Sequence, residues 1–177
     1  DDTQVYGRCS PSHMDDLAAR VSSCTDDILS WMRSNRLQLN ADKTELIWCA
    51  TPRRLPLHTV IPIRVGSAII SPSSSVRDLG IYVDADLSMR THVSRTTAGC
   101  FAALRQIRSV RRSLPTAAIK TLVVSLVLSK LDYGNASLAG VPANLLRRLQ
   151  SVLNAAARTI TGLPRSAHIS STLAELH

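Results

Sequence analysis

The feature that most limits the possible folds is the regular spacing of apolar residues in the second half of the chain. From Ser88 onward, apolar residues recur every three or four positions, and Pro115 and Pro142 each begin a new segment of this kind. Such spacing places apolar side chains on one face of a helix, and proline is well tolerated in the first turn. The pattern predicts three to four packed helices. The segment 115–131 is apolar almost all round, so we expect it to be buried. The positions expected to face inward on the other two long helices are Val93, Cys100, Leu104, Ile107, Leu145, Leu149, Val152, Ala156 and Ile160.

The first half of the chain combines one helical pattern with several short alternating patterns. A helix is predicted from Pro11 to about Asn35, with an apolar stripe made of Met14, Leu17, Val21, Cys24, Ile28 and Trp31. A hairpin with its turn at Gly66 is predicted from two alternating runs. Further strands are predicted over 3–6, 37–39, 44–50 and 76–83. The fold class is therefore α+β, with a mixed part over 1–86 and a helical part over 87–177.

Charge is unevenly distributed along the chain, and this restricts the class of partner. Lys and Arg total 21 against 13 Asp and Glu, a net charge of +8, while aromatic residues make up 3%. Residues 99–177 hold ten of the cations and two of the acids. This excess favours nucleic acid ahead of an anionic membrane, and the scarcity of aromatic rings argues against base stacking. Phosphate contacts are predicted near one helix end and on another helix, the alternative being a solvated face: Arg105, Arg108, Arg111, Arg112, Arg147, Arg148 and Arg158.

The four cysteines, at 9, 24, 49 and 100, show neither the close spacing of a zinc site nor a cluster with histidine. They predict four buried free thiols in a reducing compartment. The acidic and polar start of the chain lacks the pattern of a signal peptide. Residues 121–129, the longest uncharged run of the apolar stretch near 125, are fewer than the ~20 that a bilayer requires. An intracellular chain without a membrane segment is expected.

Several short motifs, in a fixed order, point to one family. Asp-Asp-Thr-Gln-Val-Tyr-Gly at 1–7 resembles the catalytic turn of reverse transcriptases. The long predicted helix follows, and then Leu-Gln-Leu-Asn-Ala-Asp-Lys-Thr-Glu at 37–45. This order is similar to the palm of non-LTR, LINE-type retrotransposon polymerases, close to jockey-like elements. Val-Arg-Asp-Leu-Gly-Ile-Tyr-Val-Asp at 76–84 resembles the same family's segment at the primer-grip hairpin. Looser likenesses to its helical thumb lie at 131–134, 149–150 and 160–164.

The resemblance implies roles for individual residues. Asp1 would match the metal-binding carboxylate of the catalytic turn and Asp2 its neighbour, in a site for two Mg²⁺ ions. Lys43 would match a lysine proposed to protonate the leaving pyrophosphate. The backbone of Leu79 and Gly80 would approach the primer end. Taken alone, Asp1 and Asp2 are more typical of a solvated acidic tail, and Leu79 and Gly80 of a strand with a glycine bulge. Lys43 is as typical of a solvated turn.

The resemblance also implies what the parent protein does. Residues 1–86 would be the C-terminal part of a palm and 87–177 a truncated thumb. The intact polymerase would copy an RNA template by extending a DNA primer with deoxynucleotides, in the nucleus and cytoplasm. The chain opens and stops as if cut, so the fingers, the rest of the palm and a further metal-binding Asp would be missing partners. No polymerase activity is expected from it alone. The alternative is a non-catalytic, basic nucleic-acid-binding or protein-interaction fragment, a transposon relic.

Overall fold

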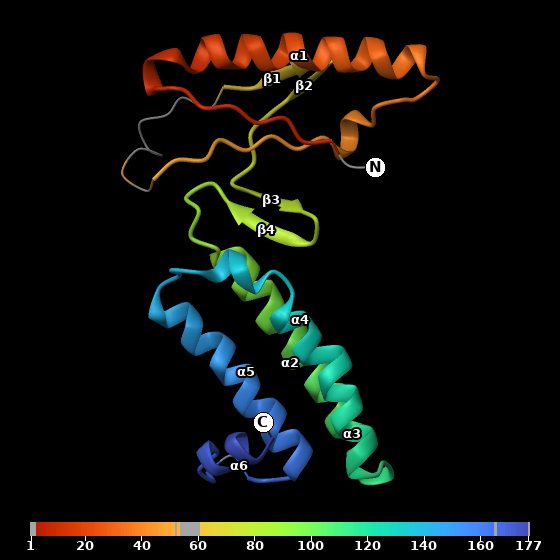
Figure 1. Ribbon diagram of the computed structural model, residues 1–177, viewed down its shortest axis with the longest axis vertical. Helices are drawn as coiled ribbons and strands as arrows, with labels where there is room; N and C mark the ends of the chain where they lie inside the picture. Colours follow the sequence, from red (N-terminus) through yellow and green to blue (C-terminus); the bar gives the residue numbers. More distant parts are fainter. Residues whose placement is uncertain (1–2, 52, 54–60, 165, 177) are drawn as a thin grey trace. The chain divides into compact units, whose positions relative to one another are not determined.

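A computed structural model describes residues 3–51, 53, 61–164 and 166–176 (Figure 1). The chain divides into two compact units, Asp1–Leu87 and Ser88–His177. Helices occur in both units, and two small antiparallel sheets lie in the first. The α+β class predicted from the sequence is therefore confirmed, whereas the assignment of the two parts to palm and thumb stays a prediction.

The first unit begins with a helix whose two ends follow from the sequence. Pro11 opens the short 3₁₀ turn η1 (Pro11–His13), which continues into α1 (Met14–Ser34). Asn35 ends the helix, and its side-chain Nδ2 donates a hydrogen bond to the carbonyl oxygen of Trp31 at 2.8 Å. The predicted helix is confirmed, including its C-terminal residue, because proline and asparagine act locally on the backbone.

The face that α1 buries differs from the predicted stripe in its second half. Met14 and Leu17 are buried as expected, but Thr25 is also buried, whereas Cys24 is exposed and Trp31 is 60% exposed. Apolar residues stand on more than one row of this helix. The sheet that packs against α1 determines which of these rows is buried. The sequence pattern of the helix alone does not determine it.

That sheet is the predicted hairpin, formed by β1 (Ile63–Val65) and β2 (Ala68–Ile70). The strands are antiparallel, and Ile63 lies opposite Ile70. Gly66 takes a φ of +61°, which allows the two-residue turn at little steric cost. The predicted hairpin and its turn are confirmed. Residues Ala18, Ile63 and Val65 form the buried centre of the unit, with partly buried apolar neighbours around them.

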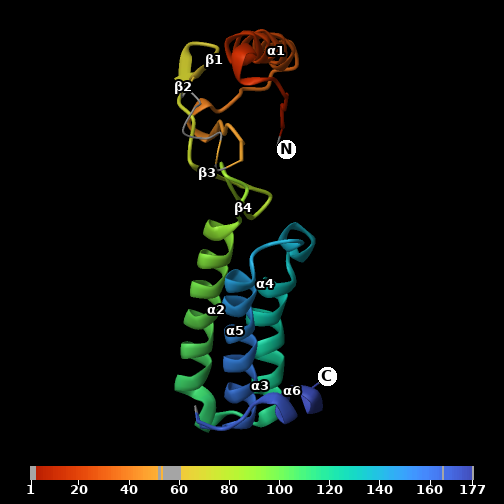
Figure 2. The same cartoon turned by 90° about the vertical axis from the view of Figure 1, so that its left-hand side faces the viewer.

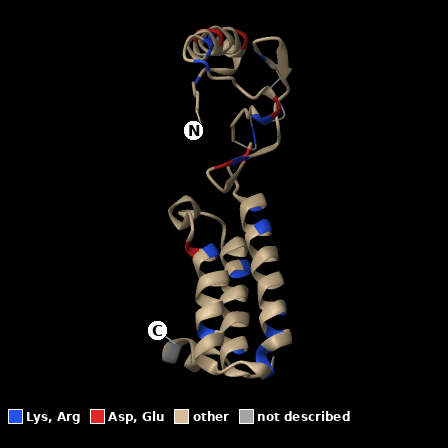
Figure 3. Cartoon of the chain, turned by 90° about the vertical axis from the view of Figure 1, so that its right-hand side faces the viewer, with Lys and Arg blue, Asp and Glu red and all other residues tan. Residues whose placement is uncertain are grey.

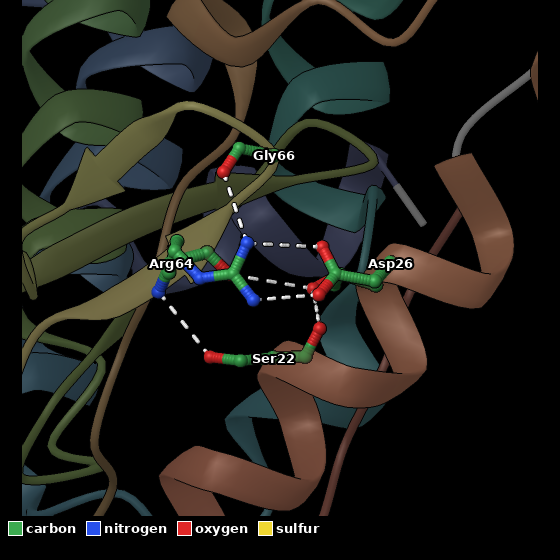
Figure 4. Close-up of polar contacts among 5 residues, drawn as sticks. Ser22, Asp26, Arg64 and Gly66 are labelled. Atoms are coloured by element: carbon green, nitrogen blue, oxygen red, sulfur yellow. Dashed lines mark hydrogen bonds and ion pairs between the residues drawn. The ribbon is translucent and has the colours of Figure 1, made fainter. Parts of the chain in front are cut away.

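Polar contacts join the hairpin to α1 at the surface (Figure 4). The Arg64 guanidinium donates two hydrogen bonds to the Asp26 carboxylate, at 2.6 and 3.3 Å, and a third to the carbonyl oxygen of Gly66 at 3.1 Å. The backbone N–H of Arg64 donates to Ser22 Oγ at 3.3 Å. Because both charged side chains are partly exposed, this pair orients the hairpin more than it stabilises the unit.

A second hairpin replaces the single strand predicted over 76–83. It consists of β3 (Ser75–Asp78) and β4 (Ile81–Asp84), which are antiparallel, with Asp78 opposite Ile81. Leu79 and Gly80 form the turn, with φ values of +44° and +88°. Positive φ at both positions is the geometry of a type I′ turn. The prediction of a single strand was wrong. Leucine rarely adopts a positive φ, so the pair Leu79 and Gly80 did not indicate a turn.

Three other predicted strands are absent from the described part of the first unit. Segments 3–6 and 37–39 have no regular structure, and 44–50 contributes an isolated parallel bridge between Leu46 and Pro72. Near its end the Ala50 N–H donates to the carbonyl oxygen of Ala85 at 3.0 Å. A β-prone run becomes a strand only where a neighbouring strand can pair with it, and no such pairing is described for these segments.

The second unit is a bundle of helices, and Figure 2 shows α2, α3 with α4, and α5 side by side. The predicted helix starts after Pro115 and Pro142 are confirmed. Gly162 ends α5, and a short further helix begins at Ser170. A π-helical turn, η5, continues α3 into α4. The elements are α2 (Arg90–Val110), α3 (Thr116–Val123), η5 (Val124–Leu128), α4 (Ser129–Asp132), α5 (Ala143–Thr161) and α6 (Ser170–Leu176).

The core of the bundle contains almost all the residues predicted to face inward. Leu149 is half-buried, and the other eight positions are buried. The prediction that 115–131 is buried all round was wrong, because Val124 and Leu126 are 54% and 42% exposed. Two neighbouring helices cover only part of a third helix's circumference. Among the helices that the structure describes, none combines the length and apolarity needed to cross a membrane.

Candidate nucleic-acid interface

The residues predicted to carry catalysis belong to the first unit, and two of them, Asp1 and Asp2, lie outside the described residues. Lys43 ends the 3₁₀ turn η2 (Ala41–Lys43), and its side chain is exposed. The Asn40 side chain accepts a hydrogen bond from the Asp42 N–H at 3.0 Å and so caps this turn. Lys43 therefore stands on a locally ordered turn, and its role as a proton donor stays a prediction.

The predicted primer-contact residues form the tip of the β3–β4 hairpin. Leu79 is 65% exposed there, beside Gly80. The side chain of Gln4 donates a hydrogen bond to Asp78, directly before this tip. The structure thus brings Gln4, a residue of the motif that resembles the catalytic turn, against the hairpin that resembles a primer grip. The sequence places these two elements more than 70 residues apart, and no pattern within either predicts their contact.

The described residues do not form a magnesium site. Across 3–51, 53, 61–164 and 166–176, no group of three His, Cys, Asp or Glu side chains gathers in a way that could hold a metal ion. The Asp78 carboxylate, at the end of β3, accepts a hydrogen bond from the Gln4 side chain. The predicted metal-binding carboxylates of Asp1 and Asp2 lie outside the described part of the chain.

The cysteines contradict the prediction of four buried thiols. Cys9, Cys24 and Cys49 are exposed, and Cys100 is buried in the core of the second unit. The Cys100 Sγ lies 3.7 Å from the carbonyl oxygen of Val127, which accepts its weak hydrogen bond. Burial raises the pKa of the Cys100 thiol, and the nearby charge of Lys130 opposes this increase. Burial of free cysteine is a statistical tendency, and three of the four positions depart from it.

The seven predicted phosphate-binding arginines divide into two groups. Arg108 and Arg111 reach across from the end of α2 to the last turn of α5. Arg108 Nε donates to Thr159 Oγ1 at 3.0 Å, and Arg111 Nε donates to the Thr159 carbonyl oxygen at 2.9 Å. Cations near the C-terminus of a helix are stabilised by its unpaired carbonyl groups. These two arginines therefore join helices, a structural contact that the sequence pattern did not predict.

Two further arginines also make contacts within the unit. Arg148 Nη1 donates to Ser94 Oγ at 3.0 Å, between α5 and α2. Arg158 Nη2 donates to the carbonyl oxygen of Ala167 at 3.2 Å, and its buried Nε has no hydrogen-bond partner among the described residues. Arg148 remains exposed, so its remaining guanidinium donors are accessible.

The remaining three arginines point into solvent. Arg105, Arg112 and Arg147 are exposed, and within the described ranges they make no hydrogen bond or ion pair. Arg90, the first residue of α2, is exposed in the same way. Sequence reasoning missed Arg90 because it stands alone, away from the clustered arginines. Its early position on the same helix as Arg105 is the signal that could have identified it.

The second unit has a surface where α2 meets α5. The bonds from Arg148 to Ser94 and from Arg108 to Thr159 mark the adjoining sides of the two helices. Positions 148 and 158 on α5 differ by ten residues, so they lie about 15 Å apart along the helix axis. We call this surface the α2–α5 face and define it by these residues: Ser94, Arg105, Arg108, Arg112, Arg147, Arg148 and Ser151.

The electrostatics of the α2–α5 face favour an anion. Figure 3 shows Lys and Arg on all the long helices of the second unit. Asp132, at the end of α4, is the single carboxylate among the side chains described in this unit. It accepts a hydrogen bond from Asn135 Nδ2 at 2.8 Å. Guanidinium and hydroxyl groups without a competing carboxylate can contact phosphate oxygens without distinguishing bases.

Comparison with known proteins shows a similarity to a transposon protein. The chain is 28% identical over 140 residues to the probable RNA-directed DNA polymerase from transposon BS of Drosophila melanogaster. The match covers 77% of this chain and 15% of the relative, so the chain spans a small part of the protein it matches. No protein-family model matches, and no solved structure gives a significant match. The similarity supports a distant relationship to reverse transcriptases.

Proposed function

We propose that the chain is part of a transposon RNA-directed DNA polymerase and that its α2–α5 face holds the phosphate backbone of a template–primer duplex. The observation that carries the proposal is the group of solvent-facing arginines on a unit whose described side chains include one carboxylate. The similarity to the transposon BS polymerase supports the class of protein. Within this proposal the polymerase is of the LINE type, close to jockey-like elements, with 1–86 in its palm and 87–177 in its thumb.

The proposed reaction belongs to the whole polymerase. A primer 3′-hydroxyl would be extended with deoxynucleotides on an RNA template, with release of pyrophosphate. Two Mg²⁺ ions held by Asp1, Asp2 and a further carboxylate from elsewhere in the parent would activate the attacking oxygen and stabilise the leaving phosphate. Lys43 would donate a proton to that phosphate, and Leu79 and Gly80 would contact the primer end. These roles stay predictions.

The role proposed for the second unit has a measurable electrostatic signature. Each arginine that contacts phosphate on a duplex releases counterions, so log affinity falls linearly with log salt concentration, by roughly 0.9 per contact. Contact with the backbone carries no sequence information, so the same dependence is expected for unrelated sequences. A helical bundle with few aromatic residues has little means of reading bases by stacking.

The test compares two triple variants with equal charge. The first replaces Arg105, Arg112 and Arg147 by glutamine, and these three arginines make no described hydrogen bond. The second neutralises three exposed arginines of the first unit, namely Arg20, Arg33 and Arg36. Binding of an RNA–DNA hybrid is measured over a range of salt concentrations, after circular dichroism has shown that both variants keep their helices.

We expect the salt slope of the first variant to shrink by roughly 2–3 units, and that of the second to stay unchanged. Equal losses in the two variants would show that net charge alone attracts the duplex. An unchanged slope in the folded first variant would show that these arginines face only solvent. Either result overturns the proposal, and so does a loss restricted to one sequence, which would indicate base recognition.

A further inference from the structure

One side of the continuous helix formed by α3, η5 and α4 faces solvent. The inner side of this helix packs against α2 and α5 and buries Ile119, Val123 and Val127. On the outer side, Val124 is 54% exposed near the middle. We call this outer side the α3–α4 face and define it by residues that are all exposed: Ala117, Lys120, Thr121, Val124, Ser125, Ser129 and Asp132.

Hydrogen bonds along the helix show that the small residues of the α3–α4 face lie in one row. Thr121 Oγ1 donates to the carbonyl oxygen of Ala117 at 3.2 Å, and Ser125 Oγ donates to that of Thr121 at 2.9 Å. Ser129 Oγ donates to the carbonyl oxygen of Ser125 at 2.5 Å. The Ser129 N–H donates to the carbonyl oxygen of Val124 across the π turn, so Val124 borders the same row. A second helix can therefore approach closely without leaving these hydroxyl groups unsatisfied.

Opposite charges stand at the two ends of the α3–α4 face. Lys120 lies one turn before Val124, and Asp132 lies one turn after Ser129. Positions 120 and 132 differ by twelve residues, which is about 18 Å along a helix axis. Lys130 follows Ser129 directly, so it is turned by about 100° and stands off the face. The face thus carries one positive and one negative side chain.

We propose that the α3–α4 face pairs with the same face of a second copy of this chain, the two helices running antiparallel about a two-fold axis near position 126. Position 126 is midway between Lys120 and Asp132, so each Lys120 meets the partner's Asp132 and two ion pairs form. Val124 of each copy packs beside the axis. The antiparallel direction also opposes the two helix dipoles.

The charge pattern identifies a second copy as the occupant. A helix that is positive at one end and negative at the other is complementary to itself when it is reversed. A parallel pair would place Lys120 beside the partner's Lys120. A nucleic-acid backbone would meet one lysine on this face and would be repelled by Asp132. A partner of a single charge sign would match only one end.

The net charge of each chain does not prevent this pairing. The chain carries +8, but the arginines of α2 and α5 lie on other helices of the second unit. At 0.15 M salt the screening length is about 8 Å, so repulsion over longer distances is weak while charges in contact still attract. The dimer leaves the α2–α5 face accessible. The inference uses a different surface, goes beyond nucleic-acid binding and does not rest on it.

The test measures the mass of the full chain by sedimentation equilibrium, without nucleic acid, at concentrations from roughly micromolar to millimolar. Lys120→Glu and Asp132→Lys each reverse the charge at one end of the face, and the double variant reverses both at an unchanged net charge. Lys130→Glu is the matched control, because it changes the net charge as Lys120→Glu does, on the same helix but off the face. Circular dichroism first establishes that every variant keeps its helices.

We expect the mass of the unmodified chain to rise with concentration towards twice 19.2 kDa. Each single reversal replaces two attractive contacts by two repulsive ones, so it should weaken the dimer roughly tenfold. The double variant should recover the original affinity, and Lys130→Glu should leave it nearly unchanged.

Four outcomes would overturn the inference. A chain that is monomeric at every concentration would show that this face is solvated or belongs to another partner. A dimer that is insensitive to Lys120→Glu would use another surface. Equal effects of Lys120→Glu and Lys130→Glu would indicate net charge alone. A double variant that does not recover would show that the two side chains do not meet. None of these variants alters the α2–α5 face, so the salt-dependence test of nucleic-acid binding is decided separately.

Discussion

Arg105 and Arg108 stand three positions apart on α2, yet they meet different surroundings. Arg108 donates hydrogen bonds to Thr159 Oγ1 at 3.0 Å and to the carbonyl oxygen of Ala155 at 3.3 Å, whereas Arg105 has no partner among the described residues. The sequence shows two equivalent cations on one arc of a helix. Their separation into a helix-joining residue and a solvent-facing residue follows from where α5 lies, so only Arg105 belongs in a binding test that must leave stability unchanged.

At the same scale, two glycines predict opposite effects of the same substitution. Gly162 has a φ of +79° after the last turn of α5, and an added Cβ would overlap the Arg111 guanidinium. Gly162→Ala is therefore expected to lower the free energy of unfolding by about 1–2 kcal/mol, the cost of the left-handed conformation for an L-residue. Urea denaturation with two-state fitting measures this change.

Gly99 provides the matched control for Gly162. It lies inside α2, and no heavy atom is within 4 Å of the position its Cβ would take. Gly99→Ala should raise the free energy of unfolding by about 0.5–1 kcal/mol, because alanine loses less backbone entropy in a helix. Destabilisation by Gly99→Ala, or a neutral Gly162→Ala, would contradict the description of these two positions.

At the scale of elements, the π-helical turn η5 lies in the middle of a helix whose residues Val123 and Val127 are both fully buried. A π-helical turn holds one more residue than an α-helical turn. The helix can therefore accommodate one additional residue and keep its apolar face in the same direction. The sequence in this region is apolar at most positions and gives no sign of the extra residue. Contact with α2 and α5 determines which of these side chains are buried, and Val124 and Leu126 remain exposed.

Deletion of Ser125 tests this interpretation. Ser125 is exposed within η5, and its removal should convert the π turn to an α turn while the flanking faces keep their direction. We expect a loss of at most about 1 kcal/mol in unfolding free energy, comparable to an ordinary surface or loop change. The midpoint and slope of denaturant unfolding give the measurement.

Deletion of Gln150 is the control for a regular helix. Gln150 is exposed in α5, and removing it turns every following residue by about 100° relative to the preceding ones. Val152, Ala156 and Ile160 would leave the core, so the loss is expected to exceed about 4 kcal/mol. Similar losses from both deletions would refute the π-turn account.

At the scale of the whole molecule, the two units differ in how much apolar surface they enclose. The buried cluster of the second unit draws on α2, α3, η5 and α5 and includes Leu104, Val123, Val127 and Val152. The buried cluster described in the first unit consists of Ala18, Ile63 and Val65. Because apolar burial is the main favourable term in folding, the second unit should be the more stable one.

This difference predicts which part survives a protease. Limited digestion with a protease of broad specificity should leave 88–177 as the persistent product, while the first unit, whose segments 3–6 and 37–39 have no regular structure, is degraded earlier. Residues 88–177 produced alone should unfold in one cooperative transition. Survival of 1–87 with degradation of the helices would contradict the prediction, as would a non-cooperative melt of the isolated second unit.

The sequence by itself determined the features that depend on neighbouring residues. Helix starts at Pro11, Pro115 and Pro142 and helix ends at Asn35 and Gly162 follow from effects on the local backbone. The hairpin at Gly66 belongs to the same group. The inward faces of α2 and α5 were also predictable, since each carries one clear apolar row. The net charge of the second unit was available from composition alone.

Only the tertiary structure decided the features that depend on a neighbour distant in the chain. The row of α1 that is buried, the exposure of Val124, and the loss of the predicted strand over 44–50 all depend on what packs alongside. The same holds for the candidate site, where Thr159 engages Arg108 and Arg111 while Arg105 and Arg147 remain in solvent. A side chain's type limits the contacts it can make. The partner that it meets is set by the packing of helices, which local patterns do not encode.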